Sequence, residues 1–554
     1  MINFLQKRRF NETKRRERSE SPPFVPFVDE AATAQSSFTP PLVLVAFIFP
    51  ALAGYNFGYD IGSTSGAIQR LRHVPAAAAL DGSPLLQGLL TSGSLFGTCV
   101  GTALSFLVAA PLGRRGELLL AATLYLLGTA ICTLAPDGTY LLHAVFAGRG
   151  AYGLGVAFAM HAAPVYISEV TPPSIRGVLV SLKEAMIVVG ILSGFSASAL
   201  TTAYAVPFAI SWRLIWLPPA LIALIVFIGM LYAPPSPRWL LLRAASLQDR
   251  DPSKALRYGE EAARGLRRLR SRTLCGDPVC DDRAVEEELQ SIRSMLGSGG
   301  SSSTRRRKNG NGSGGEGGGE ASCGEVLSAR RALIAGLGLV LLQQVTGQPS
   351  VLYYQESIFR DAGFGSLAAY ASVIVGGAKL LATMFTVLRV DHYGRRPLLF
   401  AGISLMLVSL ITLSIAFYTR DSTTSSSSRE DGNADASSDL ASILIVIALM
   451  VYVCGYQIGF GPIAWLMISE VFPLRTRGTA LSIAVTVNFG FNLLVTFTLP
   501  SIQQAFDSFA PGRGMSYLFA LYAGFCVASI AFTHACVPET KGKTLEEIER
   551  ELRD

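Results

Sequence analysis

Asp60 is the residue whose type and position in this chain could do chemistry, because it lies inside an apolar segment long enough to cross a bilayer. The segment runs from Leu42 to Ile68, and a bilayer core of about 30 Å needs roughly 20 apolar residues. An acid there costs on the order of 3 kcal/mol on insertion scales, so it usually faces a cavity or a partner and is usually used. The chemistry it offers is proton binding and release.

Arg149 is the natural partner of Asp60, because it lies in a second apolar segment whose Gly-rich run GRGAYGLGV permits close helix approach. A carboxylate caught between burial and an arginine can load and release a proton as its cavity opens and closes. The alternative is a buried ion pair that only fixes helix packing. The Gly-rich run does not predict a phosphate-binding loop, because no strand precedes it.

A second polar group, Gln343, Gln344 and Gln348, could bind a polyol. Residues i and i+4 are neighbours on a helix, so Gln348 can share a face with Gln344. Amides supply paired donors and acceptors for hydroxyl groups, and an aromatic face can cover the C–H surface of a sugar. The alternative is that these amides stabilise helix pairs within the membrane.

The composition predicts an all-α membrane protein. The 554 residues are 50% hydrophobic and 16% charged, with a mean hydropathy of +0.40, whereas soluble domains are nearer 25% charged. The apolar runs are continuous and not alternating, which favours helices over a barrel. A lipid bilayer is therefore an expected partner.

The net charge of +7 lies outside the apolar runs, as orientation by cytosolic Lys and Arg requires, so it does not indicate nucleic-acid binding. The eight cysteines show no disulfide framework. Cys275 and Cys280 lack a second ligand pair for zinc. With no catalytic triad, metal cluster or nucleotide-binding loop in the sequence, we expect neither an enzyme nor a cofactor.

Twelve apolar runs predict two bundles of six transmembrane helices. We expect a cytosolic tail at 1–41, a first bundle at 42–232, a cytosolic loop at 233–329, a second bundle at 330–537 and a cytosolic tail at 538–554. The loop combines short amphipathic helices with a Gly/Ser-rich linker. The twelve expected spans are 42–68, 85–109, 117–135, 140–167, 178–200, 213–232, 330–359, 367–390, 397–418, 440–468, 479–505 and 515–537.

The two predicted bundles repeat each other in sequence. SEVTPPSIRG at 168–177 is echoed by SEVFPLRTRG at 469–478, and GRR at 113–115 by GRR at 394–396. Repeats of six helices build many transporters, with the substrate at the midplane between the halves.

These motifs, taken in order, resemble the sugar porters of the major facilitator superfamily. The resemblance covers about 42–545, and its QQVTGQPSVLYY and HAAP variants are most similar to plant and algal vacuolar-glucose-transporter-like and xylose–proton-symporter-like carriers. The motifs are GRR at 113–115, PVYISEVTPPSIRG at 164–177, PPSPRWLL at 234–241, QQVTGQPSVLYY at 343–354, VDHYGRRP at 390–397, GPIAWLMISEVFPLRTRG at 461–478 and PETKG at 538–542.

The resemblance implies roles for individual residues. In the proton-coupled sugar porters, an Asp and an Arg matching Asp60 and Arg149 carry coupling, whereas facilitative relatives often have a neutral residue for the Asp. Trp465 matches the sugar-stacking Trp and Asn488 a polar sugar contact. A pair of tyrosines that closes over the sugar from the outside is matched by Tyr353 and Tyr354.

Three residues depart from the family pattern. Pro349 stands where many relatives have Asn, Glu184 where many have a sugar-binding Gln, and Lys379 where some have Asn. Each added charge needs compensation in a low-dielectric cavity, so we expect a Glu184–Lys379 pair across the central cavity. His161 is more typical of a packed helix residue than of a proton relay.

The repeated motifs also imply a cytosolic gate of charged clusters. The clusters would hold the halves together and break when the carrier opens inward. The alternative is static stabilisation of helix ends. The first-half loop, AAPLGRR, lacks an acid equivalent to Asp391. The expected members are Arg114, Arg115, Glu169, Arg176, Asp391, Arg395, Arg396, Glu470 and Arg477.

The sequence therefore predicts a monomeric, proton-coupled carrier of a monosaccharide, a hexose or xylose, that works by alternating access. One alternative is a facilitator of the same fold without protons. Another is a non-transporting sugar sensor that signals through the long loop, which an intact Asp60–Arg149 pair disfavours. The resemblance favours an internal membrane, such as the vacuolar one, over the plasma membrane.

Overall fold

The computed structural model describes residues 41–171, 173–248, 250–270, 283, 285–294, 330–426, 434–472 and 477–541. Within these residues the chain forms helices joined by short turns, and no strand occurs. The expected tails, the Gly/Ser-rich linker and the pair Cys275 and Cys280 fall on residues outside these ranges, apart from 41 and 538–541.

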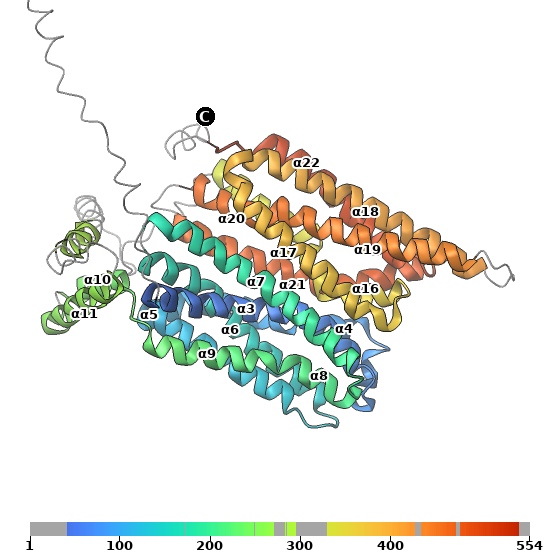
Figure 1. Ribbon diagram of the computed structural model, residues 1–554, viewed down its shortest axis with the longest axis horizontal. Coiled ribbons are helices and arrows are strands. Elements are labelled where there is room, and N and C mark those ends of the chain that lie inside the picture. Colours follow the sequence, from blue (N-terminus) through green and yellow to red (C-terminus); the bar gives the residue numbers. More distant parts are fainter. Residues whose placement is uncertain are drawn as a thin grey trace, which may run out of the picture.

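The first half of the chain folds into one bundle, coloured blue to green in Figure 1. The longest element, α5, contains parts of two membrane crossings, which meet at Gly113. The φ of +70° at this residue turns the chain. Its helices are α3 (Pro41–Leu71), η2 (Pro75–Leu80), α4 (Pro84–Thr91), α5 (Gly93–Thr133), α6 (Leu141–Val170), α7 (Pro173–Ala203), α8 (Phe208–Trp216) and α9 (Pro218–Tyr232).

The second half forms the other bundle, coloured yellow to red in Figure 1. Its first crossing is broken after Val345, where Gly347 adopts a φ of +84°. Its helices are α14 (Arg330–Val345), α15 (Gln348–Tyr353), α16 (Gln355–Asp361), η3 (Gly365–Leu367), α17 (Ala368–Tyr393), α18 (Arg395–Ser426), α19 (Ala434–Ile458), α20 (Phe460–Val471), α21 (Arg477–Phe509) and α22 (Gly514–Cys536).

The predicted twelve-helix arrangement is confirmed. Nine segments of the described chain are long and apolar enough to cross a membrane: 111–133, 141–170, 182–203, 208–232, 365–389, 395–420, 441–468, 480–509 and 514–536. The other three crossings are α3, α4 with the first part of α5, and α14–α16. These three crossings carry Asp60 and the three glutamines.

Two glycines bring α3 and α7 into backbone contact. A Cβ on Gly58 would lie 1.8 Å from the carbonyl oxygen of Ile187, and one on Gly62 would lie 2.1 Å from that of Ile191. A similar approach joins α5 to α6, where a Cβ on Gly153 would meet the Ser94 oxygen at 1.8 Å. Small residues allow such close helix packing in membranes, and here the packing draws α3, α5 and α6 around Asp60.

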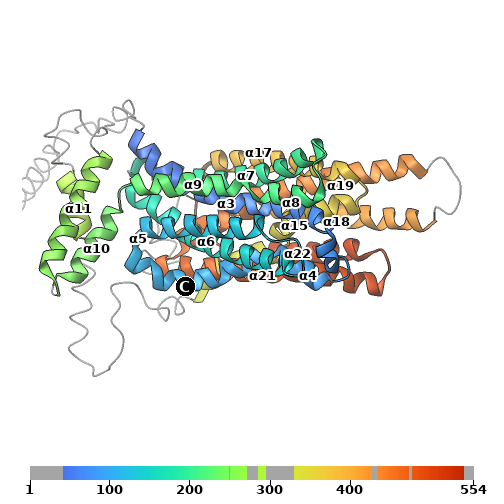
Figure 2. The same cartoon turned by 90° about the horizontal axis from the view of Figure 1, so that it is seen from below.

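Two helices outside the bundles, α10 (Pro237–Leu247) and α11 (Pro252–Arg270), pack crosswise beyond one end of the molecule (Figures 1 and 2). Leu240 and Leu241 of α10 form a small core with Ala262 and Leu266 of α11 and with Leu289. We call this the α10–α11 end and the opposite one the far end. The end of α18 and the start of α19 project at the far end (Figures 1 and 2).

Candidate functional site

Asp60 lies in the middle of α3 and is buried, with hydrogen-bond donors around its carboxylate. Oδ1 is 3.1 Å from Nη1 of Arg149, and Oδ2 accepts from the Ser94 hydroxyl at 2.6 Å. The Thr64 hydroxyl lies 3.4 Å from Oδ1. The structure thus brings together the two charged residues that the sequence analysis paired. It adds Ser94, which the sequence analysis did not identify.

Arg149 is held in place by more than its partner acid. Nη2 donates to the Thr91 carbonyl at 2.9 Å and to the Ser94 hydroxyl at 3.1 Å. Its guanidinium carbon lies 5.3 Å from the centre of the Trp216 ring, within the range of a cation–π interaction. The arginine is therefore positioned by groups other than the acid.

Tyr353 of α15 links this pair to the second bundle. Its hydroxyl lies 3.5 Å from Asp60 Oδ2, a long contact that crosses between the halves. The neighbouring Tyr354 instead donates to the Thr496 carbonyl at 3.1 Å, within its own half. The two adjacent tyrosines, predicted to act together, thus have different partners.

A small cavity of about 20 Å³ lies beside the carboxylate, lined by Asp60, Ser63, Arg149, Trp216 and others. A space of this size holds about one water molecule. Its lining is polar on the side of the ion pair, so a water there would have hydrogen-bond partners.

A second buried ion pair lies nearer the far end, and this pair joins the two halves. Arg70 Nη1 lies 3.3 Å from Glu356 Oε1, and both side chains are almost fully buried. Ser198 bridges them, because its hydroxyl is 2.9 Å from Arg70 Nη1 and donates to Glu356 Oε2 at 2.6 Å. Arg360 also reaches Glu356 Oε1, at 3.0 Å. We call these four residues the far-end clasp.

The clasp was not predicted, although Arg70 and Glu356 are visible in the sequence. Both stand near the ends of apolar runs, where charged residues ordinarily anchor a helix at the membrane surface. Further hydrogen bonds reinforce the join: Arg70 Nη2 donates to the Thr202 hydroxyl at 2.6 Å, and the Glu356 N–H to the Ser65 hydroxyl at 2.9 Å. These contacts close the far end between the bundles.

The predicted amides line the second bundle at the α14–α15 break. Gln343 Nε2 donates to the Phe460 carbonyl at 3.1 Å, and its Oε1 accepts from Asn488 Nδ2 at 3.3 Å. Gln344 Oε1 and Gln348 Nε2 are buried without a hydrogen-bond partner among the described residues. Unsatisfied buried amides are costly, which marks them as groups available to a ligand.

Trp465 of α20 packs half-buried against the core, one turn beyond Gly461. The break between α19 and α20 at Gly459 exposes the Phe460 carbonyl to Gln343. Asn488 and Gln343 therefore join α21 and α14 to the start of α20, the helix that carries Trp465. Gln457 and Asn492, not predicted, also carry buried amides in this half.

The expected pair of Glu184 and Lys379 is not formed in this conformation. The carboxylate of Glu184 lies 2.7 Å from the adjacent Lys183, and its side chain is half-exposed. Lys379 turns instead toward α19 and donates to Gln457 Oε1 at 2.8 Å. Each charge has a nearer partner within its own bundle, so the two do not meet.

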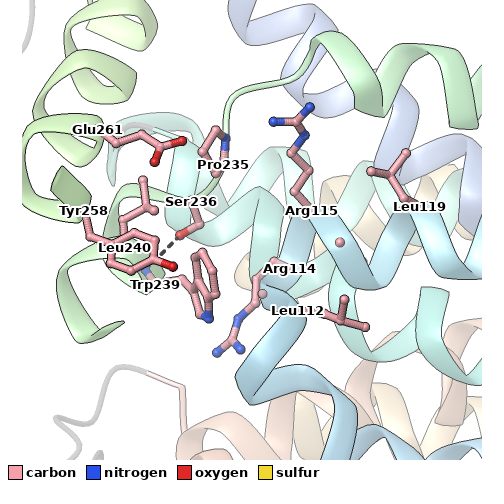
Figure 3. Close-up of a pocket in the computed structure, with 12 residues that line it drawn as sticks. Leu112, Arg114, Arg115, Leu119, Pro235, Ser236, Trp239, Leu240, Tyr258 and Glu261 are labelled. Carbon is pink, nitrogen blue, oxygen red and sulfur yellow. Dashed lines mark hydrogen bonds between the residues drawn. The ribbon is translucent and has the colours of Figure 1, made fainter. Parts of the chain in front are cut away.

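The GRR motif of the first half lies at the α10–α11 end, beside a pocket of about 280 Å³ (Figure 3). Arg114 Nε is 3.6 Å from Glu169, as the gate hypothesis expects. Arg115 instead donates to the carbonyls of Met230 and Leu231 at the end of α9, at 2.8 and 2.6 Å. Helix ends leave carbonyls unsatisfied, so Arg115 acts as a cap.

The equivalent motif of the second half has the same arrangement. Arg395 Nη2 lies 2.8 Å from Glu470 Oε1. Arg396 donates to the His534 carbonyl at 2.8 Å. Glu539 accepts from the backbone N–H groups of Arg395 and Arg396 at the start of α18, at 3.2 and 3.0 Å.

Both clusters stay within one half. Among the side chains described, no ion pair joins the halves at the α10–α11 end, and the inter-half ion pair is Arg70–Glu356. The expectation that these clusters hold the halves together is therefore not met in this conformation. Arg176, Asp391 and Arg477, also expected there, lie outside the described side chains.

His161 contacts a buried acid that the sequence analysis passed over. Its Nδ1 lies 2.7 Å from Glu117 Oε1. Glu117 is fully buried and stands near the start of the third crossing. A histidine with one carboxylate partner within a single bundle fits the packed role expected for it.

Two six-helix bundles with a buried acid–arginine pair at their interface and a polar cluster beside it define a secondary carrier of the major facilitator fold. Residues 42–552 match the family model described as "Sugar (and other) transporter", so the chain belongs to that family. It is a sugar transporter and not an enzyme.

Several relatives match almost the whole chain. The chain is 42% identical to "D-xylose-proton symporter-like 3, chloroplastic" of Arabidopsis thaliana, over 94% of this chain and 84% of that one. It is 29% identical to "Major myo-inositol transporter IolT" of Bacillus subtilis, over 94% and 95%. The xylose transporter XylE from E. coli in an inward-open conformation shares the fold, with a TM-score of 0.69, 24% identity, and coverage of 92% and 99%.

Proposed function

We propose that this chain moves a monosaccharide, a hexose or xylose, together with protons by alternating access, and that Asp60 carries the proton. The observation that supports this most directly is the double connection of Asp60. Its carboxylate contacts Arg149 in its own half and the Tyr353 hydroxyl of the other half. Rocking of the halves therefore changes the surroundings of the acid.

The small cavity beside Asp60 supports a proton route. A water in this space could carry a proton to the carboxylate. When Asp60 takes up a proton, it loses its charge attraction to Arg149, whose other hydrogen bonds keep it in place. Buried charged residues in membrane segments commonly serve such relays.

The unpartnered amides support a sugar site at the midplane. Gln344 and Gln348 offer an acceptor and a donor to hydroxyl groups, and Trp465 offers an aromatic face within the same bundle. Tyr353 and Tyr354 lie on the far-end side of the break, as residues that close over a sugar would. The whole site is built within one chain, which supports a monomer as the working unit.

We propose further that both termini lie in the cytosol and that the carrier acts in an internal membrane. Basic residues concentrate in the two tails and the central loop, which is the cytosolic bias expected of loops. One relative is named as a chloroplastic protein, which supports an internal membrane.

Uptake into proteoliposomes under an imposed pH gradient tests the proposal. Wild type is expected to accumulate labelled glucose or xylose against its gradient. Asp60→Asn should abolish this accumulation but keep sugar exchange at equal pH, because the asparagine cannot carry a proton. Glu117→Gln is the matched control, since it neutralises another buried acid within one bundle and should keep accumulation.

The rival functions give different outcomes. A facilitator would equilibrate sugar with no proton flux, and Asp60→Asn would change nothing. A sensor would bind sugar and move none. Undiminished accumulation by Asp60→Asn would rule out the assigned role of this acid.

A further inference from the structure

Four acids of the membrane-spanning helices each contact a basic side chain, whereas Lys379 contacts no acid in the described part of the chain. Asp60 pairs with Arg149 at 3.1 Å, Glu184 with Lys183 at 2.7 Å, Glu356 with Arg70 at 3.3 Å, and Glu117 contacts His161 at 2.7 Å. Across the described side chains, no carboxylate lies within 4 Å of the Lys379 nitrogen. Its positive charge therefore has no counter-ion among the described side chains.

Lys379 is buried in the middle of the 365–389 span, with 4% of its surface exposed. Its nitrogen donates to Gln457 Oε1 at 2.8 Å and lies 5.2 Å from the centre of the Tyr456 ring. An ammonium group has three N–H donors, and this one has a single hydrogen-bond partner among the described residues. Burying a charge without a counter-ion is expensive, so a chain that keeps one there usually uses it.

The lysine belongs to the same polar cluster as the proposed sugar site. A Cβ on Gly461 would lie 2.9 Å from Nε2 of Gln457, so the Gln457 amide packs against the start of α20. The carbonyl of Phe460, one residue before Gly461, accepts from Gln343 at 3.1 Å. The chain of contacts therefore runs from Lys379 through Gln457 to the amides expected to bind the substrate.

We propose that Lys379 is the counter-ion for a carboxylate on the substrate, so that this carrier prefers an acidic monosaccharide, such as a hexuronate, over a neutral one. This inference rests on the proposed transport function and names the substrate class of the same site. A carboxylate would accept the free N–H donors of Lys379 in charge-assisted hydrogen bonds, which are the strong ones. The charge count favours a carboxylate over a phosphate, because one unmatched positive charge balances a monoanion and not a dianion.

Initial uptake of labelled glucuronate and labelled glucose by the full chain in proteoliposomes at pH 7 tests this inference. Wild type should show a kcat/KM for glucuronate at least about tenfold above that for glucose, since a hydrogen bond to a charged group is worth roughly 1.5–3 kcal/mol. Lys379→Gln should lower that ratio by about tenfold or more, because it should lower kcat/KM for glucuronate more than kcat/KM for glucose. Lys379→Arg, which keeps the charge, should retain the preference.

The outcomes separate this inference from the function on which it rests. If wild type takes up glucose and refuses glucuronate, the counter-ion role is overturned while sugar transport stands. If Lys379→Gln loses pH-driven glucose accumulation and leaves the ratio unchanged, the lysine serves coupling and not selection, which also overturns the inference. If wild type moves neither compound, the proposed function fails, and the inference with it.

Discussion

Arg70 and Glu356 form a buried ion pair between the first helix of one bundle and the broken first helix of the other, 3.3 Å from Nη1 to Oε1. Ser198 contacts both, so three helices meet at this point. The far end is therefore closed by charge as well as by apolar packing. Opening it would bring both charges into water, where each is well solvated alone.

Breaking this pair should favour the conformation that is open at the far end. In Glu356→Gln, Arg70 stays buried without its counter-ion, a situation that costs about 3–5 kcal/mol, and opening to water relieves it. We expect the ratio of open to closed molecules to rise by at least about a hundredfold. Spin labels at Tyr204 and Leu367, exposed residues of the two halves at this end, would report the increased distance.

Arg213→Gln is the matched control for this measurement. Arg213 pairs with Asp137 at 2.7 Å in the same region of the molecule, but both residues belong to the first half and the acid is exposed. Surface pairs are worth about 0–1 kcal/mol, so the distance distribution should stay as in wild type. An unchanged distribution in Glu356→Gln as well would show that the clasp does not set the conformation.

Tyr353→Phe should alter proton coupling, whereas Tyr354→Phe should not. The Tyr353 hydroxyl is the donor that reaches Asp60 from the other half, at 3.5 Å, and Tyr354 bonds to Thr496 within its own half. A single hydrogen bond contributes about 0.5–1.5 kcal/mol, so we expect a few-fold to tenfold change in pH-driven uptake. The check is the pH profile of uptake, with sugar exchange at equal pH as the reference. Equal profiles for both variants would refute a coupling role for Tyr353.

The crossings of this fold could be predicted from sequence, because lipid demands long apolar runs and each run leaves its own signal. The acid–arginine pair could be predicted for the same reason, since two charges in neighbouring runs need each other. The pairing of Arg70 with Glu356 could not be predicted in this way. Their burial comes from the meeting of the two halves, which no local pattern encodes.

The side-chain partners near the motifs were predicted only in part. Arg114 and Arg395 do contact Glu169 and Glu470, because repeated charges at helix ends pair locally. Lys379 was expected to face Glu184 across the cavity. Sequence assigns a residue to a span but does not fix its rotation about the helix axis, and the lysine turns toward α19.

Glu539→Gln should weaken the start of α18 in a pH-dependent way. Burial raises the pKa of the Glu539 carboxyl, but hydrogen bonds from backbone N–H groups, including those of Lys541, Arg395 and Arg396, outweigh it and hold the pKa below the ordinary value of 4.5. A depressed pKa means that the stabilisation is present above about pH 4.5 and is lost as the pH falls through the folded-state value.

Thermal unfolding in detergent measures this effect. Glu539→Gln should unfold on the order of a degree or two below wild type at pH 7, and the two should converge in acid. Glu286→Gln, which removes an exposed carboxylate 3.9 Å from Arg293, should match wild type throughout. A constant difference between pH 7 and acid would show that the carboxylate charge is not what caps the helix.

Gln348→Met should weaken sugar binding without loss of stability, because Nε2 of Gln348 has no partner among the described residues. Removing a hydrogen bond to substrate costs about 1 kcal/mol, so the half-saturation concentration should rise roughly fivefold to tenfold. Gln343→Met should differ, since it breaks bonds to Phe460 and Asn488 and leaves a buried amide unsatisfied. It should lower the unfolding temperature as well as the affinity. If Gln348→Met keeps wild-type affinity and loses stability, this amide supports packing and does not contact the sugar.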